Sequence, residues 1–404
     1  IYYYRITTVL NSVDFKKQPN GLLTHSLLTD HGWGFVGLNI NYQHVKDYTA
    51  GMNPITGEVE YTADHHDLQI LDNGNFLILI HDSQIVDMSE FGGDKETEVI
   101  GCIVQEVDED NFTVFQWSSW DEIPITDTYA PLDSNPLRYT HCNSIEEDND
   151  GNLLLSNAAL QDITKIDRQT GKIIWRMGGR QNEFVFLNDG GFAAQHDVRR
   201  LANGHITLFD NVQQGRIEPS RGVEYRVDEV NKTVEKIAEF QSPEISGADG
   251  MFMGNLQRLA NDNTVIGWGS SSTPIFTEFD GNGNRILEIS DGGIFGSYRA
   301  FRFPWQGYPI WPPVLVAHLE GNTVHLYFSW NGSTETTGYK VFGGRDRDQL
   351  TQLATVARDG FETTYTYDLP VGDSTAGFWF FRVVPINDVG EDGTPSNDDY
   401  VVPG

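Results

Sequence analysis

The sequence predicts an all-β chain in which a β-propeller over residues 1–312 precedes a small β-sandwich over residues 313–404. Three observations support this fold class. Aromatic residues make up 12% of the chain and glycine is frequent, which is typical of short strands joined by tight turns. A strand–turn–strand unit recurs through the first region. Long stretches with helical periodicity are absent from the sequence.

The recurring unit consists of two strands with alternating apolar and polar residues around an Asp, Asn or Gly turn. Its turns are about 51 to 61 residues apart, and a second type of hairpin lies between successive copies. Two hairpins supply the four strands of a propeller blade, so roughly 310 residues predict five or six blades. The copies of the first unit are Asn53–Tyr61, Val104–Trp117, Ile163–Trp175, Val223–Phe240 and Phe276–Ile289.

Histidine begins three copies of the second hairpin, at His66, His141 and His196, whereas a fourth copy from Gly254 has none. Equivalent strand positions in a propeller form a ring around its axis. We therefore expect the three imidazoles to converge at one polar site. Asn143 lies two residues after His141 on the same strand face, so its amide is expected to reach that site.

Neighbouring residues of a strand point to opposite faces, so His65 is expected to face away from His66. Asp67 and Asp197 are expected to hold turns rather than to orient the imidazoles. Three imidazoles suit zinc or copper, but the sequence has no HxH or HExxH spacing. The prediction is therefore a histidine site without a metal.

The C-terminal region begins after the linker Trp311-Pro312-Pro313. Its strand-like runs have the spacing of a small β-sandwich of about 90 residues, and they carry no evident chemistry. They are Thr323–Trp330, Gly338–Phe342, Thr363–Leu369 and Gly377–Pro385.

The chain has 27 basic and 58 acidic residues, for a formal net charge of −31. Such a surface repels nucleic acid and anionic membranes, so neither is an expected partner. It also repels anionic substrates, so an anion site must be locally positive. No run of about 18 apolar residues predicts a membrane span.

Cys102 and Cys142 are the only cysteines, and the sequence leaves open whether they pair or stay as thiols. Asn111, Asn231 and Asn331 lie in N-x-S/T sequons, which are possible glycosylation sites. Extracellular residence is expected from the acidic surface, from the start without methionine and from the family resemblance described next.

The chain resembles the arylsulfotransferase family from about His65 onward. Its C-terminal segments resemble the fungal-type branch of that family, including a fibronectin type III-like domain. The motifs of the family core are His141-Cys142-Asn143-Ser144-Ile145, Lys165-Ile166-Asp167, Thr170-Gly171, Ile174-Trp175-Arg176-Met177-Gly178-Gly179, Gln195-His196-Asp197 and Leu208-Phe209-Asp210-Asn211. Those of the fungal-type branch are Ser297-Tyr298-Arg299-Ala300-Phe301 through Trp305, Gly307 and Pro309, and Tyr327-Phe328-Ser329-Trp330-Asn331-Gly332. The stretch Phe381-Arg382-Val383-Val384-Pro385 resembles a late strand of a fibronectin type III domain.

This resemblance implies a six-bladed propeller that transfers a sulfuryl group between phenols through a sulfated histidine. The matching nucleophile is His196, while His66, His141 and Asn143 match groups that bind sulfuryl oxygens. Tyr298 and Arg299 are expected to contact the substrate. The reaction needs neither a metal nor an organic cofactor.

One residue departs from the family pattern. The motif after the His-x-Asn strand reads Ser-Ser-Arg in the family, and that arginine binds the sulfuryl group. The aligned residues here are Leu155-Ser156-Asn157, so Asn157 replaces a permanent cation. Arg180 is a candidate to supply the missing charge. Arg199 is a weaker candidate, because it is expected to point to the strand face opposite His196.

Three functions are compatible with these features. The first is histidine-mediated sulfuryl transfer with an aryl sulfate and a phenol as substrates. The second is a carbohydrate-active enzyme, a lyase or hydrolase acting on an acidic polysaccharide through the same histidines. The third is a propeller that binds glycans without catalysis. Asn157 weighs against the first function, and the three histidines weigh against the third.

Overall fold

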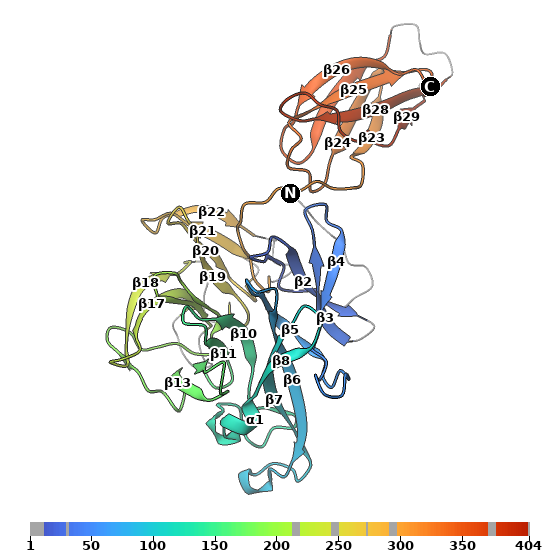
Figure 1. Cartoon of the computed structure of the whole chain (residues 1–404). Helices are drawn as coiled ribbons and strands as arrows, with labels where there is room; N and C mark the ends of the chain where they lie inside the picture. Colours follow the sequence, from blue (N-terminus) through green and yellow to red (C-terminus); the bar gives the residue numbers. More distant parts are fainter. Residues whose placement is uncertain are drawn as a thin grey trace. The chain divides into compact units, whose positions relative to one another are not determined.

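The computed structural model shows an all-β protein (Figure 1). It describes residues 12–29, 32–211, 219–243, 250–271, 274–290, 297–370 and 377–402. Within these ranges no helix has the length and apolarity needed to cross a membrane. The described helices are single short turns, namely η1 (Ser89–Phe91), α1 (Ser119–Glu122) and η2 (Ile125–Asp127).

The chain divides into two compact units. The larger unit comprises Thr8–Gly37 and Val45–Phe303. The smaller unit includes Leu38–His44 and Pro304–Gly404. The sequence-predicted boundary between residues 312 and 313 falls inside this last stretch.

Antiparallel four-stranded sheets that follow one another along the chain build the larger unit. The first sheet contains β1 (Lys16–Lys17), β2 (Leu23–Thr29), β3 (Gly32–Leu38) and β4 (His44–Tyr48). The second contains β5 (Ala63–Ile70), β6 (Phe76–Val86), β7 (Thr97–Val107) and β8 (Thr113–Ser118), with β9 (Leu137–Arg138) parallel to β7.

The remaining sheets of this unit repeat the same order. The third contains β10 (Cys142–Glu147), β11 (Leu153–Asn157), β12 (Asp162–Ile166) and β13 (Ile173–Gly178). The fourth contains β15 (His196–Arg200), β16 (Ile206–Asp210), β17 (Arg221–Asp228) and β18 (Thr233–Phe240), with β14 (Val185–Phe186) parallel to β18. The fifth contains β19 (Asn255–Arg258), β20 (Thr264–Gly267), β21 (Phe276–Phe279) and β22 (Arg285–Ile289).

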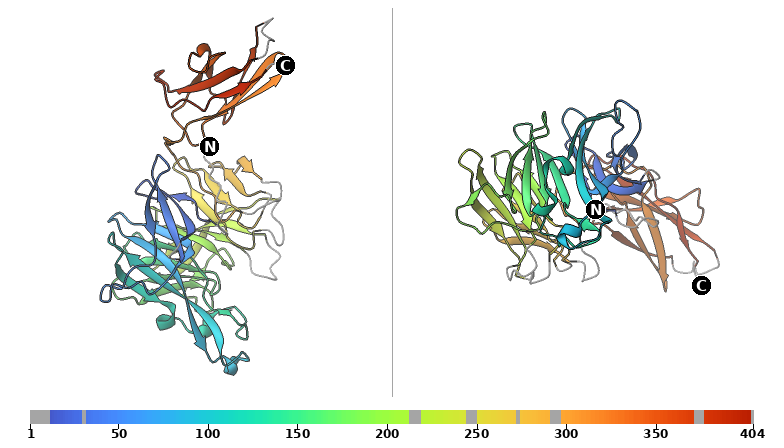
Figure 2. Two further views of the ribbon diagram at one scale, coloured as in Figure 1. Left: turned by 90° about the vertical axis from the view of Figure 1, so that its right-hand side faces the viewer. Right: turned by 90° about the horizontal axis from the view of Figure 1, so that it is seen from below.

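The sheets are arranged as propeller blades. The first strands of the second to fifth sheets adjoin one another, because β5 contacts β10, β10 contacts β15, and β15 contacts β19. β5 also contacts β2, the second strand of the first sheet. Figure 2 shows the sheets following one another in chain order from blue to yellow. The core lies between neighbouring sheets: Leu153 and Leu155 of β11 pack toward the second sheet, and Leu154 packs toward the fourth. Burial on both faces is what a blade inside a propeller requires.

Aspartates close the predicted hairpin turns. The Oδ1 atom of Asp167 accepts the backbone N–H of Gln169 at 2.9 Å, and Oδ1 of Asp280 accepts that of Asn282 at 2.9 Å. These Asx turns replace backbone hydrogen bonds where the chain reverses direction. The Asp residues that form these turns are the sequence feature by which the repeat could be predicted.

The described residues form five blades. The repeat spacing predicted five or six, and the family resemblance implied six. Two features account for the difference. Asn53–Tyr61, predicted as a hairpin, has only an isolated bridge between Met52 and Val59 in this part of the chain. The connections over residues 119–141 and 179–195 are long and consist mostly of residues outside strands. Dividing the chain by about 55 residues per blade counts these connections as blade residues and so gives too many blades.

Cys102 of β7 and Cys142 of β10 form a disulfide that joins the second and third sheets. Both residues are buried in the core between these sheets. The structure thus settles a pairing that the sequence left open.

The smaller unit contains a β-sandwich. One sheet has β23 (Val314–Glu320), β24 (Thr323–Ser329) and β27 (Thr363–Asp368). The other has β26 (Thr351–Ala357), β25 (Gly338–Gly344), β28 (Trp379–Ile386) and β29 (Asp399–Val401). Both sheets contribute to one core that includes Phe328, Tyr339 and Phe381. The sequence predicted β24, β25, β27 and β28 and missed the other three strands.

Candidate active site

The three predicted histidines lie together at the starts of the inner strands of three blades. Nε2 of His66 is 3.2 Å from Nε2 of His141, and their ring centroids are 5.0 Å apart. The rings of His141 and His196 are 5.6 Å apart in an edge-to-face arrangement. Residues separated by 130 positions in the sequence thus line one site.

β-Bulges place these side chains. In the fourth sheet His196 pairs with Phe209 but Arg199 pairs with Thr207, so β15 holds one extra residue. The backbone of Asp197, within the bulge, accommodates the extra residue by adopting a left-handed conformation, with φ of 54°. Similar register shifts follow Ala63 in β5 and Cys142 in β10. Bulges re-aim side chains beside functional sites in many proteins.

The irregular start of β5 makes one sequence prediction wrong. His65 was expected to face away from His66, yet its ring stacks on that of His66 with centroids 4.4 Å apart. The register of β5 shifts between Ala63 and Leu68, so strict alternation does not hold there. His65 therefore belongs to the histidine cluster, and its ring also lies 5.2 Å from that of Trp33.

His196 is held in one tautomer. Its Nδ1 atom lies 2.8 Å from Oδ1 of Asn211 and 3.0 Å from the carbonyl oxygen of Ala194. The amide nitrogen of Asn211 donates to the carbonyls of Gly250 and Met253 at 2.7 Å each, which fixes the amide orientation. Since both neighbours of Nδ1 are acceptors, Nδ1 carries the proton and Nε2 has a free lone pair.

Burial keeps His196 and His141 neutral. Burial lowers the pKa of His196 to about 4, although the hydrogen bond to Asn211 opposes that change. Burial, together with the neighbouring His66 and His196, holds the pKa of His141 well below its usual range. At neutral pH His196 is therefore an uncharged imidazole with an available Nε2 lone pair.

Asp64 supports the other side of the site. Its Oδ1 atom accepts hydrogen bonds from Nδ1 and from the backbone N–H of His66, the latter at 2.7 Å. Burial alone would raise the pKa of Asp64, but the imidazoles of His66, His81 and His65 hold it well below its ordinary value. An ionised carboxylate thus orients His66, as carboxylates do for histidines in acid–base sites.

Asn143 is fully buried beside the histidines. Its amide nitrogen donates to the carbonyl oxygen of Gln195 at 2.8 Å, which fixes the amide orientation. Its Oδ1 is buried and has no hydrogen-bond partner among the described residues. A buried acceptor of this kind is costly unless a ligand supplies a donor, such as a hydroxyl group.

Asn157, which replaces the family arginine, has a structural role here. Its Oδ1 accepts the backbone N–H of His141 at 2.9 Å and that of Leu160 at 3.2 Å. These bonds hold the chain entering β10 and the turn after β11. The predicted role of Asn157 as a substrate ligand has no support from these contacts.

Replacing Asn157 with alanine is expected to lower the free energy of unfolding by about 1–3 kcal/mol, because two buried backbone donors lose their acceptor. Chemical denaturation of the native protein and the variant measures this change. A difference below a few tenths of a kcal/mol would contradict the assigned role.

Arg180, Tyr298 and Arg299 have other partners. Arg180 donates to the carbonyl oxygen of Thr128 at 3.1 Å, and its guanidinium lies 4.5 Å above the ring of Tyr129. The Tyr298 hydroxyl donates to the carbonyl oxygen of His66 at 2.9 Å. Burial raises the pKa of Tyr298 well above its usual value, so it stays protonated. Tyr298 therefore positions the His66 backbone.

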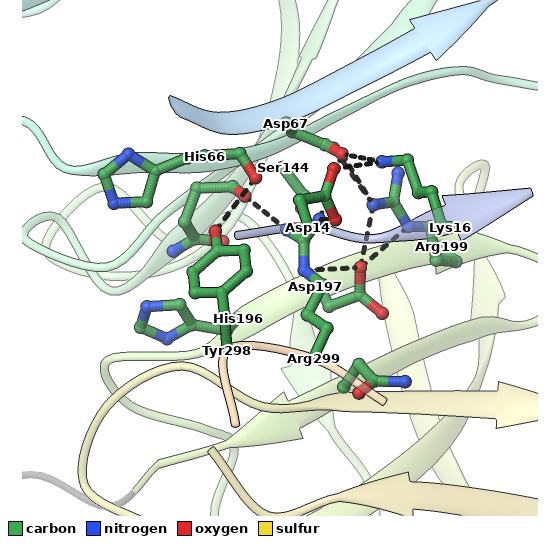
Figure 3. A network of polar contacts seen from close by, with 12 residues as sticks. Asp14, Lys16, His66, Asp67, Ser144, His196, Asp197, Arg199, Tyr298 and Arg299 are labelled. Atoms are coloured by element: carbon green, nitrogen blue, oxygen red, sulfur yellow. Dashed lines mark hydrogen bonds and ion pairs between the residues drawn. The ribbon is translucent and has the colours of Figure 1, made fainter. Parts of the chain in front are cut away.

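Arg299 lies at the centre of a buried ion network. Its guanidinium is 2.6 Å from Asp14, 3.0 Å from Asp67 and 3.3 Å from Asp197. Arg199 and Lys16 pair with the same carboxylates, so three cations balance three anions. Figure 3 shows this network on one side of the cluster and the rings of His66, His196 and Tyr298 on the other.

This network assigns roles that the sequence only partly predicted. Arg199 points away from the histidines, as expected. Asp67 and Asp197 do more than hold turns, because they join inner strands of separate blades through Arg299. Arg299 was expected to contact the substrate, but the structure places it in this network.

Asp64 and Asn211 are the site residues that sequence reasoning missed. Asp64 directly precedes the two adjacent histidines, which was an available signal. Asn211 contacts His196 only because β15 and β16 form a hairpin. Asp14, the carboxylate bound by Arg299, was also not predicted, because it precedes the first predicted repeat. Neither could be assigned without the pairing of the strands.

Comparison with known structures gives distant similarities. A Bacteroides caccae protein of unknown function has 12% identity and a TM-score of 0.43, covering 72% of this chain and 88% of that chain. A catalytically inactive variant of virginiamycin B lyase from Staphylococcus aureus has 11% identity and a TM-score of 0.37, with 92% and 90% covered. The Cps50 (Swd1) propeller domain of Myceliophteria thermophila has 9% identity and a TM-score of 0.40, with 81% and 97% covered.

No curated protein matches the chain. The sequence profile of the arylsulfotransferases (ASST) matches residues 22–292, which is most of the chain and spans the three histidines. This match does not distinguish a fungal branch or extend over the C-terminal β-sandwich. By the extent of this match, the chain belongs to the arylsulfotransferase (ASST) family.

Proposed function

We propose that this protein transfers a sulfuryl group from an aryl sulfate to a phenol, with His196 as the nucleophile. The observation that carries the proposal is the fixed tautomer of His196, whose Nδ1–H faces Asn211 and Ala194. A neutral imidazole with a free Nε2 is the form needed for attack on sulfur. Membership of the arylsulfotransferase family supports the substrate class.

The transfer proceeds in two balanced steps. The Nε2 lone pair of His196 attacks sulfur, the S–O bond to the aryl group breaks, and the phenol leaves after taking a proton from the His66–His141 pair. The acceptor phenol then loses its proton to that pair and attacks sulfur, which breaks the N–S bond. The sulfuryl group ends on the acceptor, and His196 returns to its neutral form.

His66 and His141 are placed to transfer the protons and to stabilise the negative charge of the sulfuryl group. Their Nε2 atoms are 3.2 Å apart, so at most one proton fits between them when both rings are neutral. Protonation of His66 against the Asp64 carboxylate supplies an imidazolium, whose Nε2–H donates to a sulfuryl oxygen. The buried Oδ1 of Asn143 is placed to accept the hydroxyl of a phenol.

Phenol release from an aryl sulfate tests this proposal. Native protein with 4-nitrophenyl sulfate and a phenol acceptor should release nitrophenol, and His196→Ala should lower the rate by about 1,000-fold or more. His325→Ala, in the C-terminal sandwich, removes an imidazole far along the chain and should keep the native rate. Sulfuryl transfer would be refuted if the native protein cleaved a uronate polymer instead. It would also be refuted if the native protein turned over no substrate and His196→Ala bound glycan as tightly as the native protein does.

Asn211 is expected to act through the His196 tautomer. Asn211→Leu removes the nearer of the two acceptors at Nδ1 and leaves only the carbonyl oxygen of Ala194, so the proton is held on Nδ1 less firmly and kcat should fall on the order of 100-fold. Asn211→Asp keeps an acceptor and should retain more of the activity. Steady-state kinetics of both variants checks this, and equal losses in the two would contradict the tautomer argument.

We also propose that the protein works outside the cell. The Cys102–Cys142 disulfide supports this location, because disulfides persist mainly in oxidising compartments. The acidic composition of the chain, with a net charge of −31, is compatible with a secreted protein.

A further inference from the structure

One buried carboxylate of the site is surrounded by imidazoles beyond those used in the proposed transfer. Asp64 has a side chain only 1% exposed, and its Oδ2 atom lies 3.0 Å from Nδ1 of His81 and 3.8 Å from Nδ1 of His65. Its Oδ1 is bound by His66. Asp64, His65 and His66 each offer a ligand atom, and these atoms lie within 4.8 Å of one another.

Hydrogen bonding explains only one of the two Asp64 oxygens, because Oδ1 accepts from His66. Despite its near neighbours, the buried Oδ2 of Asp64 has no aligned hydrogen-bond partner among the described residues. A buried carboxylate oxygen that is close to imidazoles without an aligned hydrogen bond requires an explanation, and a bound ion is one.

The type and spacing of these atoms fit a transition metal ion. Imidazole nitrogen with carboxylate oxygen is a preferred donor set for Zn²⁺ and similar ions. Metal–ligand bonds of about 2.1 Å place tetrahedral ligands about 3.4 Å apart. Asp64 Oδ2 lies 3.8 Å from Nδ1 of His65 and 3.0 Å from Nδ1 of His81, close to that value. Asp64 Oδ1 and Nδ1 of His66 are closer, as atoms that share a proton are, so ion binding would have to displace that proton.

We propose that Asp64, His65 and His66 bind a divalent transition metal ion of the Zn²⁺ class, with His81 beside the same carboxylate as a fourth group. This site differs from the predicted triad of His66, His141 and His196, because three of its four residues lie outside that triad. The sequence alone predicted no metal, since adjacent histidines and a histidine on the next strand form no familiar spacing.

The ion would have a specific use if the proposed sulfuryl transfer holds, and this part of the inference depends on that function. The chain has a net charge of −31, and Asn157 stands where the family has an arginine. A dication beside His66 would restore positive charge near the sulfuryl group. Ligation of Nδ1 would replace the proton that His66 shares with Asp64, so the ion would take the place of the imidazolium charge and leave the remaining proton on Nε2, which faces His141.

Cobalt binding tests the site without relying on turnover. Co²⁺ added to metal-stripped full-length protein should saturate at one equivalent, with visible absorption bands of a four- or five-coordinate ion. His65→Asn and His81→Gln should each weaken Co²⁺ binding at least tenfold. Asp64→Asn should abolish binding, and circular dichroism verifies that each variant is folded. His325→Gln serves as the matched control and should bind as the native protein does.

The outcomes separate this site from the proposed reaction. His196→Ala should lose phenol release and retain the cobalt spectrum. Native protein that shows no stoichiometric Co²⁺ binding would overturn the metal site, as would equal binding by His65→Asn, His81→Gln and the control. The native protein could bind one equivalent of Co²⁺, lose that binding in the two variants, and yet transfer no sulfuryl group. That result would uphold the metal site and refute the reaction.

Discussion

Replacing Arg299 with methionine is expected to lower the free energy of unfolding by about 3–5 kcal/mol. Arg299 is 1% exposed and contacts three carboxylates with no exposed side-chain surface, those of Asp14, Asp67 and Asp197. Burial alone would raise the pKa of Asp67, but Arg199, Lys16 and Arg299 together hold it well below its ordinary value. Without Arg299, three buried anions share two cations.

Urea denaturation of the native protein and the variant measures this loss, and Arg226→Met provides the matched control. Arg226 pairs with Glu235 on the surface of the same unit, with 59% of its side chain exposed. Exposed pairs contribute about 0–1 kcal/mol, so this variant should unfold close to the native midpoint. Equal effects of the two substitutions would show that the network does not hold the blades together.

The second large effect is the acid tolerance of catalysis. The proposed nucleophile must be neutral, and burial lowers the pKa of His196 to about 4. At pH 5 about 90% of such an imidazole is neutral, compared with about 3% for one with the usual pKa near 6.5. Single-turnover phenol release should therefore show no loss on acidification until the pH approaches 4, and should fall tenfold per pH unit below 4.

Stability has the same sign of pH dependence. The pKa values of His141 and His196 are lowered by burial, so the unfolded chain binds protons that the folded chain does not. Folded stability should decline as the pH falls through 6.5 toward 4. Circular dichroism at each pH separates this loss from loss of catalysis. A rate that falls with an apparent pKa near 6.5 in folded protein would contradict a neutral, buried nucleophile.

The repeated hairpins could be predicted because each places an Asp or Asn in a turn between alternating strands. The Asp167 and Asp280 turns show this relation directly. The first blade was missed because it precedes the first complete repeat, while Asn53–Tyr61 has a turn signal without paired strands. The number of blades also depends on the length of the connections between strands, and the spacing of the repeats does not show which residues belong to connections.

The convergence of His66, His141 and His196 followed from the repeat because equivalent strands have equivalent places around the axis. What surrounds them did not follow from it. The bulge in β5 brings His65 beside His66, and the β15–β16 pairing brings Asn211 to His196. Arg299 was expected near the substrate because it lies in a motif of the family beside Tyr298. A motif does not show that the two side chains have different partners.

The most direct measurement is the mass of peptides from protein quenched during turnover with an aryl sulfate. A gain of about 80 Da, one SO₃ group, is expected on the peptide that contains His196, with fragmentation assigning it to that residue. The gain should be absent from His196→Ala and should disappear from native protein when a phenol acceptor is added before quenching. Phenol transfer that proceeds in native protein with the label on another residue, or with no covalent label at all, would contradict the role assigned to His196.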